Sequence, residues 1–396
     1  HYNLGNAYKD MGQFDESISS YSRTIELKPD FELAHSNKLV TLHYAPSTTT
    51  KDLFTTASDW AAGYNANIPV VDFPNIPDPE RRLRVGYVSA DFSKHPVGFY
   101  LCQILPFHNN STVDLFAYSN SKKVDSVTDL LKKNVTAWHD VLQLTDQEVA
   151  QQIKEDEIDI LIDLSGHTQG NRLGVFALRP APIQITWMGY TGTTGLKTMD
   201  YILADQFVLP EHEKQFFSEA VAYLPGCYLC FDPPDFDIPT VPPPARKAGY
   251  ITFGSFNNRI KITPEAIASW ASILKTVDGS RMFLKTALLD SKEARQILID
   301  QFQAHGISAD RIELEGRSVR KDLLAAYQRV DIILDSHPFG GGVTTAEALW
   351  MGVPVIVLRN DRWSGRLGET ILKAVGLAEL VADSPELYHN LAIELA

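Results

Sequence analysis

A glycine-rich turn near the end of the sequence has the composition of a phosphate-binding loop. It runs from Asp335 to Thr345 as Asp-Ser-His-Pro-Phe-Gly-Gly-Gly-Val-Thr-Thr, between an apolar run at 332–334 and a helical pattern at 346–351. Glycines let the backbone approach a ligand, and the N–H groups and dipole of a helix N-terminus favour negative charge. Three glycines can also form a simple connection between a strand and a helix. The rest of the sequence is therefore needed to distinguish a phosphate-binding loop from such a connection.

Other residues could complete such a site for a nucleotide diphosphate. A departing diphosphate needs a cation and hydrogen-bond donors, and Lys261 is a candidate for the cation. Glu347 lies one turn into the expected helix, where its carboxylate could contact ribose hydroxyls. The candidate donors are the hydroxyls of Thr344 and Thr345 and the backbone of Gly340, Gly341 and Gly342. Such a site needs no metal ion.

Two histidines follow apolar runs earlier in the chain. His95 lies in the turn 90–98 after a buried strand pattern, and His167 lies in the polar turn 166–172 after another. Ligands of open α/β sheets bind at the carboxyl ends of strands, and histidine titrates near neutral pH. A lone histidine in a loop is more often structural, but this position favours a functional role for His95. His167 is the weaker candidate.

Composition excludes several classes of function. The 36 Lys and Arg residues against 49 Asp and Glu residues give a net charge of −13, which argues against nucleic acid or an anionic membrane as the main partner. No apolar run approaches the roughly 20 residues that span a bilayer, and no signal-peptide pattern opens the chain, so we expect a cytoplasmic protein. The three cysteines predict no disulfide framework, and the Cys227–Cys230 pair is expected to be structural. The chain is expected to be a fragment.

The first residues match a tetratricopeptide unit. Leu4, Gly5, Tyr8, Tyr21 and Pro29 fall on the positions that define this repeat. One unit cannot bury its own apolar face, so residues 1–46 are expected to be the end of a repeat array that binds partner proteins or packs on the next domain. Residues 47–80 are expected to be a linker that contains one helix.

The remaining chain alternates strand and helix patterns in two halves. Residues 81–232 and 249–396 each predict a Rossmann-like α/β domain, and the connection between them is rich in proline. Ligand-type loops in both halves predict a cleft, with the phosphate loop from the second half and the histidine loops from the first. The main strands expected are one within 81–89 and then 113–118, 158–164, 183–187, 201–204, 250–253, 282–285, 312–314, 331–335 and 353–358. The expected helices include 146–155 and 363–375.

Several long motifs resemble one enzyme family. They are Gly86 to Pro96, Phe176 to Gln184, Gly189 to Tyr201, Phe256 to Ile262 and Asp335 to Gly352. Together these motifs resemble the protein O-GlcNAc transferases and SPINDLY proteins of glycosyltransferase family 41, over nearly the whole chain.

The resemblance implies a GT-B fold and an inverting, metal-independent transfer of GlcNAc from UDP-GlcNAc to Ser or Thr hydroxyls of proteins. It implies no cofactor, because the nucleotide sugar is a substrate. By position, His95 matches an active-site histidine and Lys261 the lysine on the diphosphate. Thr344 and Thr345 match phosphate-binding threonines, and Glu347 matches a ribose contact. The donor site is expected to include Asn258, Gly341 and Gly342 as well.

Details of the phosphate loop leave the donor open. Val343 stands before the two threonines where the O-GlcNAc branch has histidine, and the spacing from Asp335 to Thr344 matches the SPINDLY branch, which uses GDP-fucose. Leu323 holds another position that is histidine in the family. UDP-GlcNAc is the expected donor, and protein O-fucosylation from GDP-fucose is the alternative. A non-catalytic, repeat-based binding module is a second alternative, disfavoured because Lys261 and both threonines are present.

Overall fold

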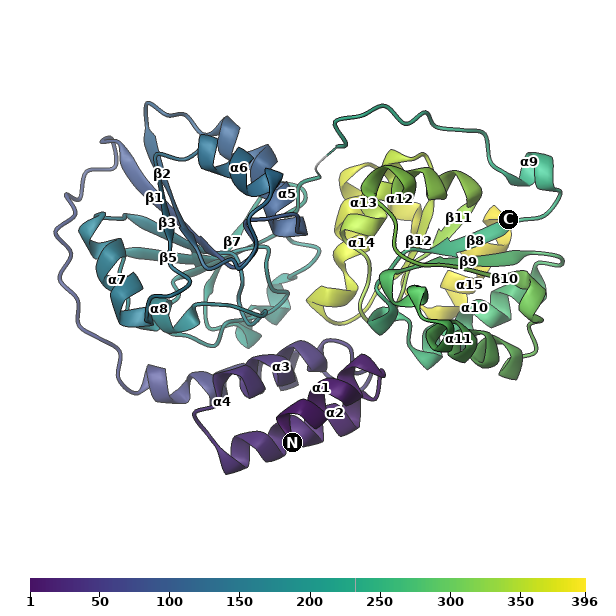
Figure 1. Cartoon of the computed structure of the whole chain (residues 1–396), viewed down its shortest axis with the longest axis horizontal. Coiled ribbons are helices and arrows are strands. Elements are labelled where there is room, and N and C mark those ends of the chain that lie inside the picture. Colours follow the sequence, from purple (N-terminus) through teal and green to yellow (C-terminus); the bar gives the residue numbers. More distant parts are fainter. Residues whose placement is uncertain (232) are drawn as a thin grey trace. The chain divides into compact units, whose positions relative to one another are not determined.

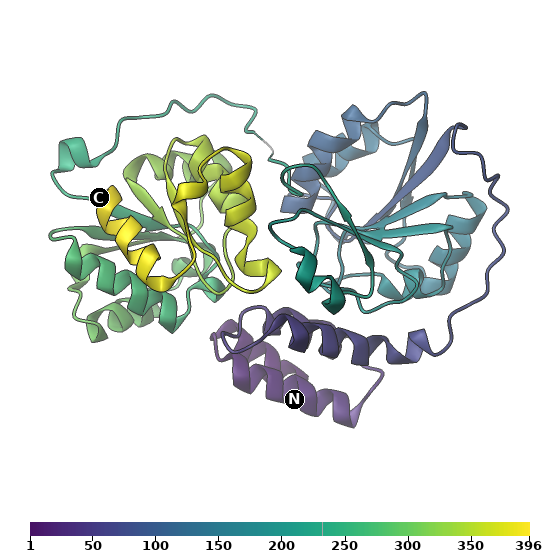
Figure 2. The same cartoon turned by 180° about the vertical axis from the view of Figure 1, so that it is seen from behind.

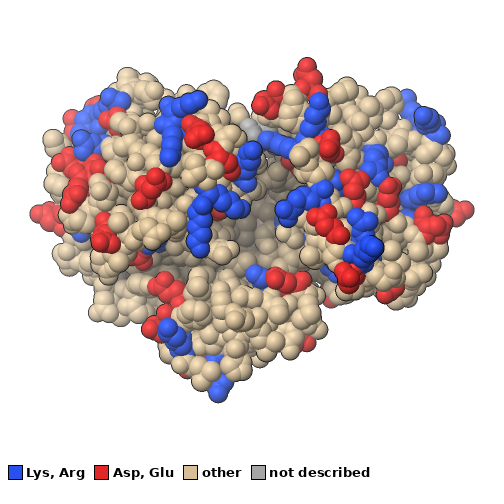
Figure 3. All heavy atoms as spheres, in the orientation of Figure 1, with Lys and Arg blue, Asp and Glu red and all other residues tan. Residues whose placement is uncertain are grey.

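The computed structural model describes residues 1–231 and 233–396, which form two compact units that divide near residue 232 (Figure 1). Both units are built on parallel β-sheets, so the predicted α/β class is confirmed. Within the described ranges, no helix is long and apolar enough to cross a membrane. On the face drawn in Figure 3, basic and acidic side chains are interspersed.

The chain begins with a helical region that precedes the first sheet. Its helices are α1 (Tyr2–Asp10), α2 (Phe14–Leu27), α3 (Glu32–Leu42) and α4 (Thr50–Asn65). A Cβ atom at Gly5 would lie 2.7 Å from the Tyr21 ring, so the glycine allows α1 and α2 to approach closely. The Ser17 hydroxyl donates to the Gly5 carbonyl at 2.8 Å and joins the two helices. The predicted helix pair is therefore present.

The first unit contains a seven-stranded parallel sheet in the order β3-β2-β1-β4-β5-β6-β7. Its strands are β1 (Leu83–Ser89), β2 (Val113–Ser119), β3 (Ala137–Asp140), β4 (Ile160–Asp163), β5 (Ile183–Thr186), β6 (Tyr201–Ala204) and β7 (Ala220–Tyr223). Its helices are α5 (Pro96–Ile104), α6 (Ser126–Lys133), α7 (Asp146–Glu155) and α8 (Leu173–Ala177). The strand order reverses between β1 and β4, so the loops that follow these two strands lie at the switch point of the sheet.

The loop 189–198 of this unit holds α4 against the sheet domain. The Asn65 amide donates to the Gly195 carbonyl at 2.9 Å, and the Lys197 N–H donates back to Asn65 at 2.8 Å. Gly195 has a φ of +81°, and a Cβ there would lie 2.4 Å from the Ala57 carbonyl oxygen. The small residues of this loop are therefore explained by close packing.

The second unit contains a six-stranded parallel sheet in the order β10-β9-β8-β11-β12-β13. Its strands are β8 (Thr252–Ser255), β9 (Arg281–Lys285), β10 (Ile312–Glu315), β11 (Ile332–Leu334), β12 (Val355–Leu358) and β13 (Val381–Ala382). Its helices are α9 (Ala245–Ala248), α10 (Pro264–Thr276), α11 (Lys292–Ala304), α12 (Arg320–Ala326), α13 (Val343–Trp350), α14 (Leu367–Ala374) and α15 (Pro385–Leu395). The order reverses between β8 and β11, which places the loops after these strands at a switch point.

Helices cover both faces of this second sheet (Figures 1 and 2). Ile332 and Leu334 pack in one apolar cluster with residues of α10, α11 and α15. Ile333, between them, packs in another cluster with residues of α12, α13 and α14. This alternation is what a strand buried on both faces requires, and it fixes the position of the loop after β11.

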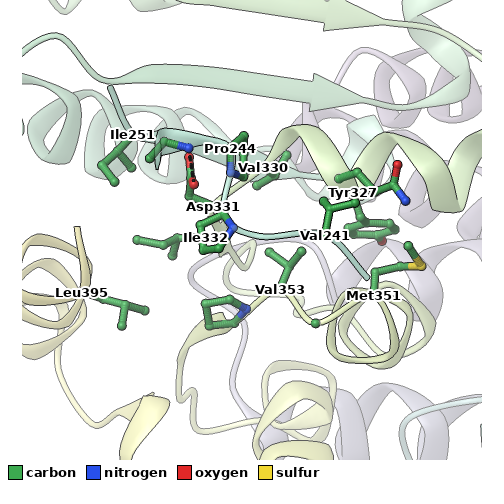
Figure 4. A pocket seen from close by; sticks show the side chains of 15 residues that line it. Val241, Pro244, Ile251, Tyr327, Val330, Asp331, Ile332, Met351, Val353 and Leu395 are labelled. Carbon is green, nitrogen blue, oxygen red and sulfur yellow. Dashed lines mark hydrogen bonds between the residues drawn. The ribbon is translucent and has the colours of Figure 1, made fainter. Parts of the chain in front are cut away.

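A cavity of about 220 Å³ opens at the amino-terminal ends of the strands of this unit. The Asp331 carboxylate at its wall accepts from the Ala245 N–H at 2.9 Å, the bond drawn in Figure 4, and from the Thr252 N–H at 2.8 Å. These two bonds attach the proline-rich connection to the sheet. The cavity lies at the opposite end of the strands from the glycine-rich loop.

Candidate functional site

The glycine-rich loop leads into the uncapped N-terminus of α13. Gly342 is the N-cap residue, and no side chain caps the helix. Among the described residues, no acceptor is hydrogen-bonded to the N–H groups of 342–345. Four such groups at one helix end, with the positive end of the helix dipole, form a site that favours an anion.

The loop requires glycine at Gly341. A Cβ atom there would lie 2.5 Å from Thr344 Oγ1 and 3.0 Å from Asp335 Oδ1. Its own N–H donates to the Asp335 carboxylate at 2.8 Å. The structure thus gives a steric reason for this predicted loop residue, whereas its contact with a donor stays a prediction.

Both predicted threonines lie in the first turn of α13, and both hydroxyls donate to the protein itself. Thr344 Oγ1 donates to Asn257 Oδ1 at 2.9 Å, and Thr345 Oγ1 donates to the Gly341 carbonyl at 3.1 Å. Thr345 is buried. A phosphate group would therefore meet free backbone N–H groups first, and each hydroxyl would have to exchange its acceptor to donate to it.

Lys261 reaches the same loop from the other side of the switch point. It lies in the short turn Arg259–Lys261 after β8, and its Nζ donates to the Gly340 carbonyl at 2.7 Å. The ammonium group also lies 4.0 Å from the centre of the Phe339 ring. Burial lowers the pKa of Lys261 to about 8, against the opposing charge of Asp335. The predicted cation is thus next to the predicted phosphate loop.

Asp335 accepts hydrogen bonds from backbone N–H groups of the glycine-rich loop, a role that the sequence did not predict. Its side chain is 1% exposed, and its carboxylate accepts from the N–H groups of Ser336 and Gly341. Burial raises its pKa, while these bonds and the charge of Lys261 act in the opposite direction. The signal in the sequence was an aspartate directly after an apolar strand, a position that often receives loop N–H groups.

Asn257, rather than Asn258, connects β8 to this loop. Asn257 is 3% exposed, and its Nδ2 donates to Asp335 Oδ1 at 2.8 Å. Asn258 is exposed, and its Oδ1 accepts only a local bond from the Ile260 N–H at 3.3 Å. A donor contact by Asn258 remains a prediction. Two adjacent asparagines could not be told apart in the sequence, because the outward or inward direction depends on where β8 ends.

Glu347 lies one turn into α13, as the helical spacing predicted, and is 5% exposed. Burial raises its pKa to about 7, and the charge of Arg320 opposes this shift. Tyr327 packs nearby: its ring stacks on Phe256 with centroids 3.8 Å apart, and its hydroxyl donates to the Thr344 carbonyl at 3.2 Å. The aromatic pair is thus joined to the first turn of α13 by the Tyr327 hydroxyl.

In the first unit, His95 is the N-cap residue of α5. Its Nδ1 accepts from the Val97 N–H at 3.4 Å and lies 3.6 Å from Asp91 Oδ2. The side chain is 44% exposed, so one face of the ring remains accessible to solvent. Burial of the remainder lowers the pKa of His95, while the charge of Asp91 raises it. A largely neutral, accessible imidazole at a strand end could accept a proton.

His167 is completely buried in the same unit. Its Nε2 donates to the Thr194 carbonyl at 2.9 Å, and the Trp60 ring packs against it at 4.7 Å. Burial lowers its pKa to about 4, so the ring is neutral at pH 7. This location favours a structural role that joins α4 to the sheet domain, and the catalytic role expected for it has no support from the geometry.

The three cysteines are among the possible metal ligands of the described residues. Cys227 and Cys230 are partly buried, and the Cys230 thiol lies 3.7 Å from the Tyr100 carbonyl oxygen. In the part of the chain that the structure describes, no group of three His, Cys, Asp or Glu side chains is arranged to bind a metal ion.

Comparisons with known proteins agree with this geometry. The family "Glycosyl transferase family 41" matches residues 69–235 and 246–396, and "Tetratricopeptide repeat" matches residues 1–31. A protein of Arabidopsis thaliana, named "Probable UDP-N-acetylglucosamine--peptide N-acetylglucosaminyltransferase SPINDLY", is 36% identical over 94% of this chain and 41% of its own length. A second Arabidopsis protein, with the same enzyme name and the designation SEC, is 31% identical over 80% of this chain and 33% of its own length.

One solved structure is similar over the entire chain. A mutant O-GlcNAc transferase of Thermobaculum terrenum is 38% identical, with a TM-score of 0.93, and the match covers 100% of this chain and 75% of that protein. The chain thus spans about two fifths of the length of the first plant relative and three quarters of this bacterial protein.

Proposed function

The chain belongs to glycosyltransferase family 41, and on that premise we propose that it transfers GlcNAc from UDP-GlcNAc to Ser or Thr hydroxyls of proteins. Its two parallel α/β units are the Rossmann-like domains of a GT-B fold. The observation that supports the proposal most directly is the pairing of Lys261 with the uncapped N-terminus of α13, at the switch point of the second sheet.

The donor diphosphate would bind where these groups converge. The N–H groups of 342–345 and the Lys261 ammonium group would stabilise the negative charge of the departing nucleotide, which is where an inverting transfer develops charge. Glu347 would contact the ribose. Gly341 and Gly342 would allow the phosphates to approach the backbone. These protein groups supply the required charge, so we propose a reaction that needs neither a metal ion nor a cofactor.

The acceptor hydroxyl would attack the sugar from the side opposite the diphosphate and lose a proton. His95, a donor phosphate oxygen or a water relay could take this proton. The helical repeat would contact acceptor proteins, and the cytoplasm is the compartment that we propose.

GDP-fucose is the second candidate donor, and Val343 is the observation that favours it. This residue directly precedes Thr344, and a valine side chain offers no hydrogen bond to the donor. The names of the two Arabidopsis relatives nevertheless specify UDP-N-acetylglucosamine, which supports the first candidate.

A direct binding and hydrolysis screen tests the proposal. The chain is titrated with UDP-GlcNAc, UDP, GDP-fucose and GDP, with thermal unfolding and release of the free sugar as readouts. Stabilisation by UDP-GlcNAc and UDP, and slow hydrolysis of UDP-GlcNAc, are expected. A response confined to GDP-fucose and GDP would reassign the donor, and no response to any of the four would contradict the enzyme proposal.

A further inference from the structure

Asn257 bridges the two halves of the candidate phosphate site. Its carboxamide lies between the Asp335 carboxylate at 2.8 Å and the Thr344 hydroxyl at 2.9 Å. It comes from the loop after β8, which also provides Lys261, whereas Asp335 and Thr344 belong to the loop after β11 and to α13. We propose that Asn257 is a positioning residue that aligns Lys261 with the N-terminus of α13. This inference rests on the proposed function.

The direction of the hydrogen bonds follows from chemistry. An ionised carboxylate only accepts hydrogen bonds, so the Asn257 Nδ2 group must face Asp335. The Oδ1 atom then faces Thr344, whose single hydroxyl proton must point toward it. The chain of bonds therefore runs from Thr344 through Asn257 to Asp335, and it fixes the Thr344 side chain in one orientation.

The Asn257 bridge also fixes the spacing of the two loops. Two other side chains of the loop after β8 donate to the glycine loop. Lys261 Nζ donates to the Gly340 carbonyl at 2.7 Å through a flexible four-carbon side chain, and Thr263 Oγ1 donates to the His337 carbonyl at 3.2 Å. The Asn257 bridge is short and buried, and both of its partners are anchored: Asp335 by the N–H groups of Ser336 and Gly341, and Thr344 by helix α13. Asn257 is thus the buried side-chain link between β8 and the start of α13, beside the bonds that Lys261 and Thr263 make to the glycine loop.

The inference predicts a selective loss of donor binding. A diphosphate contacts both loops, so misalignment weakens its binding and the stabilisation of the leaving group together. Asn257→Ala should weaken UDP binding about tenfold, as expected for the loss of buried hydrogen bonds, and should lower kcat further. The exposed Gln296→Ala variant on α11, where the side chain bonds only to Asp300, is the matched control.

A double-mutant cycle with Thr344→Val separates positioning from general destabilisation. Valine keeps the shape of threonine and removes the hydroxyl. If Asn257 acts through Thr344, Asn257→Ala should change UDP affinity less than about threefold in the Thr344→Val background. Full additivity of the two losses would contradict this part of the inference.

The Asn257→Asp variant gives a pH profile that a structural role alone would not produce. Its new carboxylate would lie against Asp335, and two adjacent carboxylates cannot both ionise without strong repulsion. With one shared proton, the pair keeps the bridge. The other titratable groups whose charges act with Asp335 are Lys261, Tyr327 and Tyr388, and they are common to both proteins. Asn257→Asp should therefore bind UDP well at pH 5.5 and lose affinity toward pH 8 more steeply than the wild type.

The experiment is isothermal titration of UDP into the wild type and these variants at pH 5.5, 7 and 8, with kcat and KM measured for sugar release. Circular dichroism and thermal unfolding establish that each variant is folded. If Asn257→Ala does not fold, the change in UDP affinity of Asn257→Asp between pH 5.5 and pH 8, compared with that of the wild type, decides the question. Unchanged UDP affinity in the Asn257 variants, with normal wild-type binding, would overturn the inference alone. Absence of nucleotide binding by the wild type would overturn the proposed function and the inference with it.

Discussion

At the scale of single residues, the environment of each candidate side chain gives it a defined electrostatic task. Lys261 is a partly buried ammonium group with one carbonyl partner and a pKa of about 8. Its remaining protons can serve a diphosphate, and a doubly negative ligand would favour its charged form. The charge state of Lys261 should therefore depend on whether the donor is bound.

Lys261→Ala should abolish sugar transfer and leave the fold intact, because the hydrogen bond that it removes joins the side chain to one loop carbonyl, that of Gly340. In the wild type, UDP affinity should fall as pH rises through about 8, since the raised pH removes the proton that the diphosphate attracts. Titration calorimetry from pH 6 to 9 measures this slope, and Lys261→Ala should lack it. A folded variant with normal activity would disprove the assignment of this lysine.

The buried carboxylate of Glu347 is expected to lower the free energy of unfolding at neutral pH and to serve donor binding. Its pKa is about 7 in the folded chain and near 4.5 when exposed, so the folded state holds a proton more tightly. The free energy of unfolding should then fall as pH rises from 4.5 to 7 and stay low above that range. Glu347→Gln should be more stable than the wild type by up to about 3 kcal/mol at pH 8, and equally stable at pH 4.

Urea unfolding at both pH values measures this difference. UDP binding by Glu347→Gln should be weaker, because an amide replaces the carboxylate that is proposed to contact the ribose. Equal stability of the two proteins at pH 8 would show that the carboxylate is not buried in solution.

At the scale of elements, the loop between β11 and α13 depends on the absence of side chains. Gly341→Ala would place a methyl group 2.5 Å from Thr344 Oγ1 and 2.9 Å from Thr345 Oγ1. The loop would have to shift, so a loss of about 1–3 kcal/mol in the free energy of unfolding and a larger loss of UDP affinity are expected.

Gly63→Ala is the control for this substitution. Gly63 lies within α4, and a Cβ atom there meets nothing within 4 Å. Alanine should stabilise that helix by about 0.5–1 kcal/mol and leave UDP binding unchanged. Thermal unfolding and calorimetry of both variants test the pair, and similar effects at the two glycines would refute the steric argument.

Many elements were predictable because their signals are local. The helix 146–155 and the strand 201–204 have the predicted bounds, since a capping threonine marks the helix and a short apolar run marks the strand. The strands β3 and β7 were missed because they lie at the two edges of the sheet and are only partly buried, so their patterns are mixed. The helix expected at 363–375 is a short turn at 363–365 followed by α14.

The placement of the candidate site was predictable in part for the same reason. Lys261, Thr344 and Glu347 lie at or next to the glycine-rich loop, as the surrounding residue types and the helical spacing predicted, and their contacts with a donor stay predictions. Asp335 and Asn257 were missed because their role depends on a contact between residues 78 positions apart. His167 was given too much weight because its loop follows a strand, although its ring turns into the core toward Trp60.

At the scale of the whole molecule, the candidate groups divide between the two units. The phosphate loop, Lys261 and Glu347 all belong to the second unit, and they are the groups that we propose to bind the nucleotide diphosphate. His95 belongs to the first unit, where its ring is accessible and its pKa is lowered. Nucleotide binding and proton removal should therefore respond to different substitutions.

His95→Ala should lower kcat for transfer to a peptide by about a hundredfold or more and leave UDP affinity unchanged, because general-base groups typically contribute that much and the nucleotide contacts lie elsewhere. The His212→Ala variant is the control, since His212 is also a histidine of the first unit but is largely exposed in a surface turn. Steady-state kinetics with calorimetry distinguish the outcomes. A normal kcat in His95→Ala would mean that a donor phosphate oxygen or a water relay accepts the proton of the acceptor hydroxyl. A loss of UDP affinity in this variant would contradict the separation of nucleotide binding from proton removal.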